Sequence, residues 1–495
     1  MSAMRNVTIA ESEETDPKNS AMTDPKITPS ALIQIETDNP VPIGDQIYKS
    51  LRVSILKGAL TGGSRLPSGR ALAAQLGVAR GTIRVAYDRL AAEGLIFGAG
   101  SAGTRVSSKL PPQPFEHEEL LDRPLDGFTR PYSSFPLPFQ VGVPAHDAFP
   151  SKVWERMRVR AVRSDAQSYT TYADPRGEAE LRKQIANHLA VSRQIQCHPD
   201  QIIVTSGYRQ GLTLTLMALQ ARGQKAWLEE PGYPLGRRAL ELAGSTIVPI
   251  PVDAEGLDVE AGIAQAADAL IALVTPGQQA PLGNTLSSNR RRDLLKWAKA
   301  NDAWIIEDDY LGELQLDGRA KPALASGDGA ERVIHIGTFS KTISPSLGLG
   351  FLVAPKLVTE KFVEIAAVML PAPNRTTQLA MAEFLADGHF LRHLRQMKDL
   401  YFERRACAMS HLNKTFSKIE ASGLGLIAFC SEMADDVALV AAARERGLAP
   451  SSLSSWYITA SKEHGLILSI TNLSNDNIVN ACATLNNVVE AQTKT

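Results

Sequence analysis

The chain has 495 residues, of which 44% are hydrophobic and 21% are charged, and its formal net charge is -1. A chain of this length is too long for one compact core, so we expect two or three domains. The composition is that of a globular protein and excludes a fibrous one. The sequence contains no uninterrupted apolar run of about 18 residues, which excludes a membrane-spanning helix.

The first 20 residues, MSAMRNVTIAESEETDPKNS, contain neither a basic lead nor an apolar stretch. They do not resemble a secretory signal, so we expect a cytoplasmic protein. The four cysteines, at positions 197, 407, 430 and 482, are scattered and form no CxxC pair. This spacing argues against a disulfide framework and against a zinc site, so we expect core thiols and no bound metal.

The chain divides by composition before any motif is considered. Residues 1–40 are polar and lack a periodic apolar pattern, which predicts a mobile tail. Residues 41–108 contain nine basic and three acidic residues, so we expect this basic segment to bind a polyanion. Residues 109–134 are rich in proline, which disfavours helix and extends the backbone, and they are predicted to link two domains.

The apolar spacing of the basic segment predicts three helices. Residues 44–60 place apolar side chains on one face, and Ser68 can cap a short second helix that stops at Gly77. A third helix is expected over residues 78–95, and a hairpin with glycines at its tip over residues 95–106. This order predicts a helix-turn-helix with a wing. The alternative is a generic helical subdomain with a solvated basic face.

The stretch RLPSGRALAAQLGVARGTIRVAYDRLAAEGLI, followed by GSAGTRV, resembles the winged helix-turn-helix of the GntR family. The resemblance implies a homodimer that binds double-stranded DNA at paired half-sites. The DNA contacts that it implies are Arg70, Arg80, Thr82, Arg84 and, in the wing, Gly103. Guanidinium groups can form two hydrogen bonds with guanine edges or phosphates, and a threonine can contact a thymine methyl group or the DNA backbone.

Residues 135–490 alternate strand-like apolar runs with amphipathic helices, which is typical of an α/β domain with a mainly parallel sheet. Three of these strands are followed by polar residues that can hold a ligand. QIIVTSGYRQG ends in a Ser-Gly turn, and the amides of Gly207 and Tyr208 can bind a phosphate there. AWIIEDDYLGEL ends in three carboxylates and Tyr310, and HIGTFSKTISPS delivers Lys341.

Pyridoxal 5'-phosphate requires all three of these strand ends. Its phosphate binds amides and hydroxyls, its ring nitrogen binds a carboxylate, and its aldehyde forms a Schiff base with an amine. Each strand end alone also fits an ordinary solvated turn or a surface lysine. Together they favour the cofactor, so Lys341 is predicted to carry it.

The order of the motifs, from YTTYADPRGEAELRKQIANHL to ILSITNL, resembles the class I aminotransferase-like fold (fold type I), and its fusion to a GntR winged helix is similar to the MocR-type transcriptional regulators. The resemblance implies that Lys341 forms the aldimine with pyridoxal 5'-phosphate, that Asp308 pairs with the pyridine nitrogen and that Tyr310 pairs with the ring hydroxyl. The other implied cofactor contacts are Gly207, Tyr208, Thr338 and Ser340 to the phosphate, and Gln279 and Tyr233 near the ring.

Three positions depart from the class I pattern. Gly348 replaces the arginine of SKxxxPxxRxG that binds the cofactor phosphate or a bound anion, and Ile467 replaces an arginine that binds a substrate carboxylate in many relatives. Gln278 replaces the histidine of a His-Gln pair. Charge-assisted hydrogen bonds are worth roughly 1.5–3 kcal/mol each. The missing arginines therefore predict weaker binding of the cofactor or of a carboxylate ligand unless other residues substitute.

Three functions follow from these features. We expect a DNA-binding transcriptional regulator whose aminotransferase-like domain binds pyridoxal 5'-phosphate and senses it or an amino-compound effector. One alternative is an active pyridoxal-phosphate-dependent aminotransferase tethered to DNA. The other is a regulator whose large domain no longer binds the cofactor and serves for dimerisation or for another ligand. The fold alone does not decide between them, because one scaffold hosts both catalysis and sensing.

Overall fold

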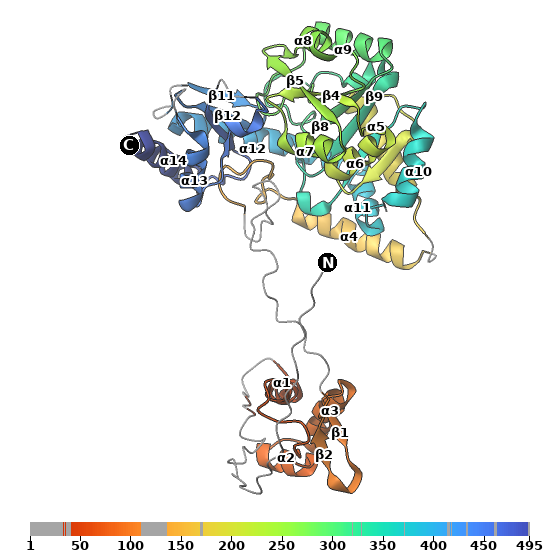
Figure 1. Cartoon of the computed structure of the whole chain (residues 1–495), viewed down its shortest axis with the longest axis vertical. Helices are drawn as coiled ribbons and strands as arrows, with labels where there is room; N and C mark the ends of the chain where they lie inside the picture. Colours follow the sequence, from red (N-terminus) through yellow and green to blue (C-terminus); the bar gives the residue numbers. More distant parts are fainter. Residues whose placement is uncertain are drawn as a thin grey trace, which may run out of the picture. The chain divides into compact units, whose positions relative to one another are not determined.

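The computed structural model describes residues 33, 35, 41–109, 136–168, 172–318, 320–327, 329–370, 372–412, 416, 418–431, 434–459 and 463–493. The chain forms two compact units, Met1–Gly127 and Phe128–Thr495, which Figure 1 draws in red to orange and in yellow to blue. The division falls within the predicted linker, which lies outside the described residues except at residue 109. The predicted tail also lies outside them, except for Ile33 and Ile35, which pack against the core of the first unit.

The first unit has the predicted winged-helix order. Its elements are α1 (Ile43–Leu56), α2 (Gly69–Leu76), α3 (Arg80–Ala92), β1 (Ile96–Gly98) and β2 (Thr104–Val106). Ser68 accepts a hydrogen bond from the amide of Ala71 at 3.2 Å and caps α2, and Gly77 ends it in the left-handed region with a φ of 66°. The helix α1 ends four residues earlier than predicted, because Gly58 turns the chain with a φ of 76°.

The second unit is built on an eight-stranded sheet whose order is β3-β10-β9-β8-β7-β4-β5-β6. The strands are β3 (Ile202–Thr205), β4 (Lys225–Glu230), β5 (Thr246–Asp253), β6 (Gly256–Leu257), β7 (Ile271–Val274), β8 (Trp304–Asp309), β9 (Val333–Thr338) and β10 (Gly350–Val353). The five strands from β9 to β5 are parallel, and β10 is antiparallel to both of its neighbours. The prediction of a mainly parallel sheet is confirmed.

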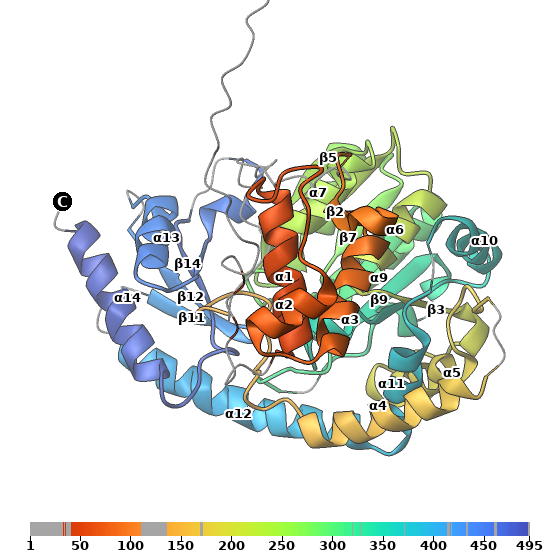
Figure 2. The same ribbon diagram turned by 90° about the horizontal axis from the view of Figure 1, so that it is seen from below.

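Helices cover both faces of this sheet. They are α4 (Ser151–Ala166), α5 (Ala179–Ser192), α6 (Tyr208–Ala218), α7 (Pro234–Leu242), α8 (Val259–Ala266), α9 (Ser288–Ala300), α10 (Thr359–Met369) and α11 (Arg375–Ala386). Ile202 and Val204 of β3 join the core under α5 and α11, whereas Ile203 between them joins the core under α6 and α10. Figure 2 shows α4, α5 and α11 gathered together. The alternation of side chains along each strand therefore produces three layers.

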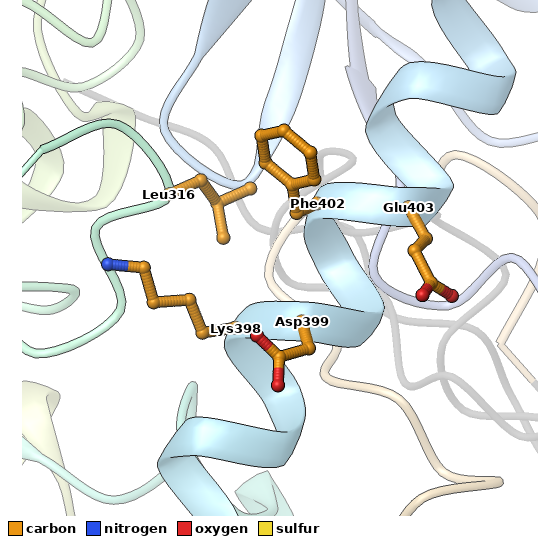
Figure 3. Close-up of a pocket in the computed structure, with 5 residues that line it drawn as sticks. All are labelled: Leu316, Lys398, Asp399, Phe402 and Glu403. Atoms are coloured by element: carbon orange, nitrogen blue, oxygen red, sulfur yellow. The ribbon is translucent and has the colours of Figure 1, made fainter.

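A smaller antiparallel sheet stands beside the large one. Its order is β11-β12-β14-β13, formed by β11 (Lys418–Ser422), β12 (Gly425–Phe429), β13 (Ser451–Ser452) and β14 (Gly465–Ser469). Three helices accompany it, namely α12 (His389–Leu412), α13 (Asp436–Glu445) and α14 (Ile478–Thr493). On its outer side α12 borders a surface hollow lined by Leu316, Lys398, Asp399, Phe402 and Glu403, which shares no residue with the predicted cofactor contacts (Figure 3).

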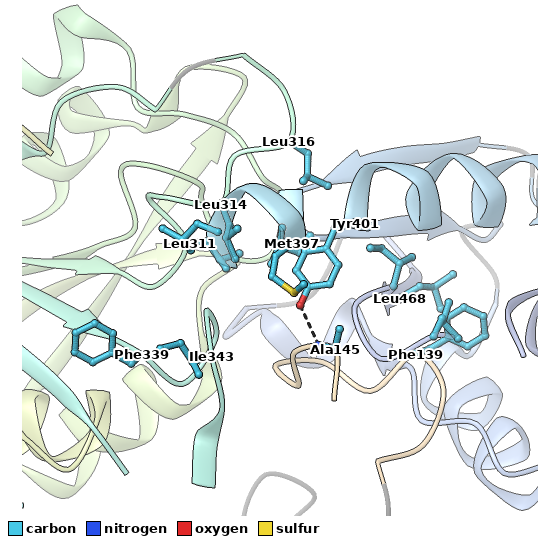
Figure 4. Packing of buried hydrophobic residues seen from close by; sticks show 14 of the residues in the cluster. Phe139, Ala145, Leu311, Leu314, Leu316, Phe339, Ile343, Met397, Tyr401 and Leu468 are labelled. Atoms are coloured by element: carbon cyan, nitrogen blue, oxygen red, sulfur yellow. Dashed lines mark hydrogen bonds between the residues drawn. The ribbon is translucent and has the colours of Figure 1, made fainter. Parts of the chain in front are cut away.

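One hydrophobic core joins the two sheets of the second unit. Tyr401 of α12 is fully buried in it, and its hydroxyl accepts a hydrogen bond from the amide of Ala145 at 2.9 Å. Tyr401 and Met397 lie between Leu311 and Leu314, which follow the large sheet, and Leu468 of the small sheet (Figure 4). Phe339 and Ile343, which flank Lys341 in the sequence, belong to the same core. The segment that carries Lys341 is thus anchored on both sides.

None of the helices in the described part of the chain combines the length and the apolar character that a membrane span requires. All four cysteines have free thiols. Cys482 is buried and the other three are partly buried.

Candidate cofactor site and DNA-binding surface

The three consecutive carboxylates at the end of β8 have different environments, because successive residues of a strand face opposite sides. Asp309 accepts a hydrogen bond from Arg193 Nε at 2.6 Å. Glu307 lies 3.0 Å from His335 Nδ1, and that contact holds the pKa of Glu307 below its usual range although burial acts in the other direction. Asp308 Oδ1 is buried and forms no hydrogen bond of ordinary geometry with a described residue, although the Tyr208 hydroxyl lies near enough to lower the pKa of Asp308. The strand therefore leaves one carboxylate free for a ligand.

Burial controls the charge of Asp308. The residue is only 5% exposed, and desolvation, together with the nearby carboxylates of Asp309 and Glu229, raises the pKa of Asp308 to about 8. Burial likewise raises the pKa of Glu229 to about 7. The Tyr208 hydroxyl is also buried and forms no hydrogen bond of ordinary geometry with a described residue, but it faces Asp308 and acts against the rise in the pKa of that carboxyl. Buried polar atoms without partners are unfavourable for folding, and a ligand that donates a hydrogen bond to Asp308 would offset that cost.

Lys341 follows β9 and reaches the same site as Asp308. Its Nζ donates a hydrogen bond to the carbonyl oxygen of Gly142 at 2.9 Å. Burial lowers the pKa of Lys341, the Asp308 carboxylate acts against this, and the positive charge of Arg209 lowers the pKa further. A lower pKa increases the fraction of neutral amine, which is the form that attacks an aldehyde.

The N-terminus of α6 meets the end of β9 at Gly207. Gly207 precedes the helix with a φ of 108°, a conformation that favours glycine. A Cβ atom on Gly207 would lie 3.7 Å from Ser340 Oγ, so the helix N-terminus and Ser340 are neighbours. Thr338 Oγ1 accepts a hydrogen bond from the backbone amide of Ser340 at 3.2 Å. The free amides of the first helical turn and the adjacent hydroxyl can together bind an anion.

The three tyrosines that were predicted to contact the cofactor, Tyr208 at the phosphate and Tyr233 and Tyr310 at the ring, come from different parts of the chain. The rings of Tyr208 and Tyr233 are 6.0 Å apart, and Tyr233 and Tyr310 both pack against one apolar cluster. That cluster consists of Ala280, Ile427, Leu453, Trp456 and Ile467. Burial, with Asp308 next in effect, raises the pKa of Tyr310 and keeps its hydroxyl protonated.

The two glutamines of the predicted His-Gln position are committed to backbone contacts. Gln279 is buried, and its amide donates to the carbonyl oxygens of Pro231 at 2.7 Å and Ala280 at 2.9 Å. Gln278 donates to the carbonyl oxygen of Leu311 at 3.2 Å. These bonds fix the turns that follow β4 and β8. A direct contact of Gln279 with a cofactor ring stays a prediction.

The two positions where class I relatives carry arginine offer no positive charge here. Gly348 adopts a left-handed conformation with a φ of 54°, and no atom lies within 4 Å of the place that its Cβ would occupy. Ile467 is 8% exposed and packs in the apolar cluster with Trp456 and Leu453. A carboxylate near Ile467 would therefore have no charged partner on β14.

The residues of this site fit pyridoxal 5'-phosphate. The unpartnered Oδ1 of Asp308 suits a protonated ring nitrogen, the amine of Lys341 suits the aldehyde, and the amides beside Gly207 suit the phosphate. The sequence motifs predicted these three groups. They did not reveal Arg193, His335 and Glu229, which set the charges of the β8 carboxylates from positions far away in the sequence.

The arginines of the first unit differ in whether they form an ion pair within that unit. Arg52 pairs with Glu93 at 2.8 Å, and Arg89 pairs with Asp45 and lies over the Tyr48 ring. The predicted contacts Arg70 and Arg80 are exposed and form no ion pair with any described residue, while Arg84 lies 3.7 Å from Asp88 on the open surface. Arg70 and Arg80 each lie in the first turn of a helix of the helix-turn-helix. Two of the residues predicted to meet DNA, Arg70 and Arg80, are therefore among the exposed cations without an ion pair to a described residue.

The remaining predicted DNA contacts, Thr82 and Gly103, are less exposed. Arg65 lies beside Gly103 and was not predicted from the sequence. The methyl group of Thr82 lies 3.5 Å from the Cβ position of Gly44, so α1 covers part of that side chain. In the wing, the Arg65 guanidinium lies 3.1 Å from the Cβ position of Gly103, and Arg65 is exposed without an ion pair among the described residues. No sequence signal indicated Arg65, because its proximity to the wing depends on how the chain folds back at residue 65.

Comparisons with known proteins agree with both units. Residues 137–485 match the family "Aminotransferase class I and II", and residues 43–106 match "Bacterial regulatory proteins, gntR family". Two solved structures share the fold of the second unit. One is a kynurenine aminotransferase of Pyrococcus horikoshii, which has a TM-score of 0.66 and 22% sequence identity, with 73% of this chain and 93% of that chain covered. The other is LysN, an α-aminoadipate aminotransferase of Thermus thermophilus, which has a TM-score of 0.66 and 24% sequence identity, with 72% of this chain and 93% of that chain covered.

The two units define a class of protein in which a GntR helix-turn-helix is joined to an aminotransferase-like domain. A protein of Rhizobium meliloti named "Probable rhizopine catabolism regulatory protein MocR" is 34% identical over 88% of this chain and 92% of its own length. The "HTH-type pyridoxine biosynthesis transcriptional regulator PdxR" of Corynebacterium glutamicum is 32% identical over 88% and 93%. The chain belongs to the MocR-type transcriptional regulators of the GntR family.

Proposed function

We propose that this regulator binds pyridoxal 5'-phosphate at Lys341 and changes its affinity for DNA in response to that cofactor or to an amino compound. One observation carries the proposal. The chain that holds the exposed arginines of a winged helix also holds a buried amine, an unpartnered buried carboxylate and a helix N-terminus within one site. The existence of a relative named for pyridoxine biosynthesis supports a link to this cofactor.

Each site residue has a distinct task in this proposal. Pyridoxal phosphate, when bound, supplies an aldehyde and an electron-withdrawing ring. Lys341 would hold the cofactor through that aldehyde, with release of water, and its lowered pKa favours the neutral form of the amine. Asp308 would accept a hydrogen bond from the protonated ring nitrogen, and Tyr310 would pair with the ring hydroxyl. The phosphate is bound by the amides of Gly207 and Tyr208 and by Thr338 and Ser340, while Tyr233 and Gln279 line the ring.

The DNA contacts follow from charge and exposure. Arg80 and Arg84, on α3, read base edges in the major groove, and Arg70 binds a phosphate from α2. Arg65 adds a phosphate contact at the wing, where Gly103 allows the backbone to come close to the duplex. The protein acts in the cytoplasm as a homodimer, in which two winged helices occupy paired half-sites.

Titrations of both ligands test the proposal. Thermodynamic linkage requires that the cofactor or amine change DNA affinity by the same factor by which DNA changes the affinity of that small ligand. We expect a factor of about 5–150, the usual range of such coupling. Fluorescence anisotropy of a labelled operator would measure one direction, and absorbance of the bound cofactor would measure the other. An effect in one direction alone would contradict the scheme.

A covalent test addresses the site itself. Borohydride reduction of protein incubated with pyridoxal 5'-phosphate, followed by peptide mass spectrometry, should find the adduct on Lys341. An adduct spread over surface lysines would argue against a specific site. Sustained conversion of an amino donor to its keto product would identify an active aminotransferase instead of a sensor.

A further inference from the structure

The anion end of the Lys341 site lacks a fixed positive charge. Between β9 and β10, residues 339–349 contain one cation, Lys341, and burial lowers the pKa of that amine. Gly348, in the same segment, has no side chain and leaves open space around its Cβ position. A phosphate dianion held only by amides and hydroxyls would keep most of its charge uncompensated. A second cation must therefore come from another element if the site is to bind a phosphate ester firmly.

Arg209 is positioned to be that cation. It is the second residue of α6, directly after the turn in which Gly207 meets Ser340. Its side chain is exposed and forms no ion pair or hydrogen bond with any residue that the structure describes. The positive charge of Arg209 also lowers the pKa of the buried Lys341 amine, in keeping with the place of Arg209 in the first turn of α6 beside Gly207.

The neighbouring arginines do not have this freedom. Arg237 of α7 donates to the carbonyl oxygen of Tyr457 at 3.0 Å, and Arg238 pairs with Glu241 at 2.9 Å. Arg193 is buried against Asp309. Among the arginines around the described site, Arg209 thus combines an uncommitted guanidinium with an electrostatic effect on Lys341.

We propose that Arg209 binds the phosphate group of pyridoxal 5'-phosphate and takes the place of an arginine at position 348. This inference rests on the proposed function. The unpartnered Oδ1 of Asp308 fixes the ring nitrogen at one end of the ligand, and the helix N-terminus beside Gly207 receives the phosphate at the other. A guanidinium in the first turn of α6 can then form two parallel hydrogen bonds with phosphate oxygens.

The test compares pyridoxal 5'-phosphate with pyridoxal, which has the same aldehyde and ring but no phosphate. Binding of each to the full chain is followed by absorbance in wild type, Arg209→Ala, Arg209→Lys and the control Arg222→Ala, an exposed arginine beyond the far end of α6. Arg209→Ala should weaken binding of the phosphate ester by about 10- to 100-fold and that of pyridoxal by less than about threefold. Arg209→Lys should lose part of the affinity, and Arg222→Ala should lose none.

A double variant that moves the positive charge from position 209 to position 348 provides a stricter test. In the Arg209→Ala background, Gly348→Arg should restore part of the preference for the phosphate ester, because no atom lies within 4 Å of the Cβ position, although a side chain at the φ of 54° strains the backbone and should lower the melting temperature. Melting temperatures of all variants confirm that each is folded. If Arg209→Ala weakens both compounds equally, or neither, the role of Arg209 is wrong although the wild type binds the cofactor. A wild-type protein that binds neither compound overturns the proposed function itself.

Discussion

The two functional regions of this chain differ in whether the polar groups that can meet a ligand are exposed or buried. In the winged helix, Arg65, Arg70 and Arg80 are exposed and surrounded by water. In the aminotransferase-like domain, Asp308 Oδ1 and the Tyr208 hydroxyl are buried and form no hydrogen bond of ordinary geometry with any residue that the structure describes. Exposed charge has little effect on folding and binds any polyanion in a salt-dependent manner. Buried unpartnered groups oppose folding and select a ligand with matching donors.

The largest effect is expected at the amine of the buried site. Lys341→Ala should abolish the covalent bond to the cofactor and the response to an effector, because no other described amine contacts Gly142 or interacts with Asp308. Basal operator binding should persist, since the winged helix belongs to a separate compact unit. Borohydride trapping and anisotropy of a labelled operator measure the two properties. An effector response that survives in the variant would show that the signal does not pass through Lys341.

The next largest effect is expected at Asp309, which has a committed partner. Asp309→Asn leaves the buried Arg193 without its carboxylate, and breaking a buried ion pair costs about 3–5 kcal/mol. Thermal melting should therefore show strong destabilisation, and the fraction that is still folded should bind the cofactor. If Asp309→Asn is stable but fails to bind the cofactor, the partner of the ring nitrogen is Asp309 and the assignment of Asp308 is wrong.

Asp308→Asn should have the opposite pattern. It should weaken cofactor binding by about 10-fold or more, since a charge-assisted hydrogen bond to the ring nitrogen is lost. The pKa of Asp308 is raised from an ordinary 3.8 to about 8, so its contribution to the stability of the cofactor-free fold is fully present below about pH 4 and is lost as the pH rises toward 8. Relative to wild type, Asp308→Asn should gain stability from about pH 5 to pH 8 and stay constant above.

Melting curves at several pH values, without cofactor, measure this difference. Equal stability of Asp308→Asn and wild type across that range would mean that the carboxyl is charged or solvated in the folded protein. Asp309→Asn serves as the matched control, since it should be less stable than wild type throughout.

The contrast also explains what the sequence could and could not predict. Asp308 lies at the end of β8, and Gly207 and Lys341 lie within three residues of the ends of β3 and β9. The C-terminal ends of strands that run in the same direction meet at one edge of a sheet, so short motifs were sufficient to predict that these residues share a site. Arg193 lies 116 residues from Asp309 and binds it only because α5 packs under the sheet. No local pattern encodes such a contact.

A similar limit applies to the winged helix. Apolar spacing and capping predicted the helices and the hairpin, because these depend on neighbours in the sequence. The burial of Ile33 in the core and the approach of Arg65 to Gly103 depend on segments that fold back from outside those elements. Sequence spacing gives no information on either.

Among the exposed arginines, Arg80 is expected to have the largest effect on DNA. As the first residue of α3, it can reach a base edge, and Arg80→Ala should cost about 1–3 kcal/mol and relax the preference at one base pair. Binding to a specific and a scrambled duplex should then change unequally. Equal loss on both duplexes would assign Arg80 to a phosphate, and no loss on either would contradict the identification of α3 as the recognition helix.

The smallest effect on DNA affinity is expected for Arg70. Its dependence on DNA sequence and on salt is more informative than its size. Arg70 lies in the first turn of α2, where a phosphate contact adds affinity without sequence information. Arg70→Ala should weaken binding to specific and scrambled duplexes alike and reduce the slope of log K against log salt by about one unit. Lys57→Ala, which removes an exposed charge just after α1, is the matched control and should leave the slope unchanged. A loss confined to the specific duplex would instead mean that Arg70 reads a base, so that α2 as well as α3 would enter the groove.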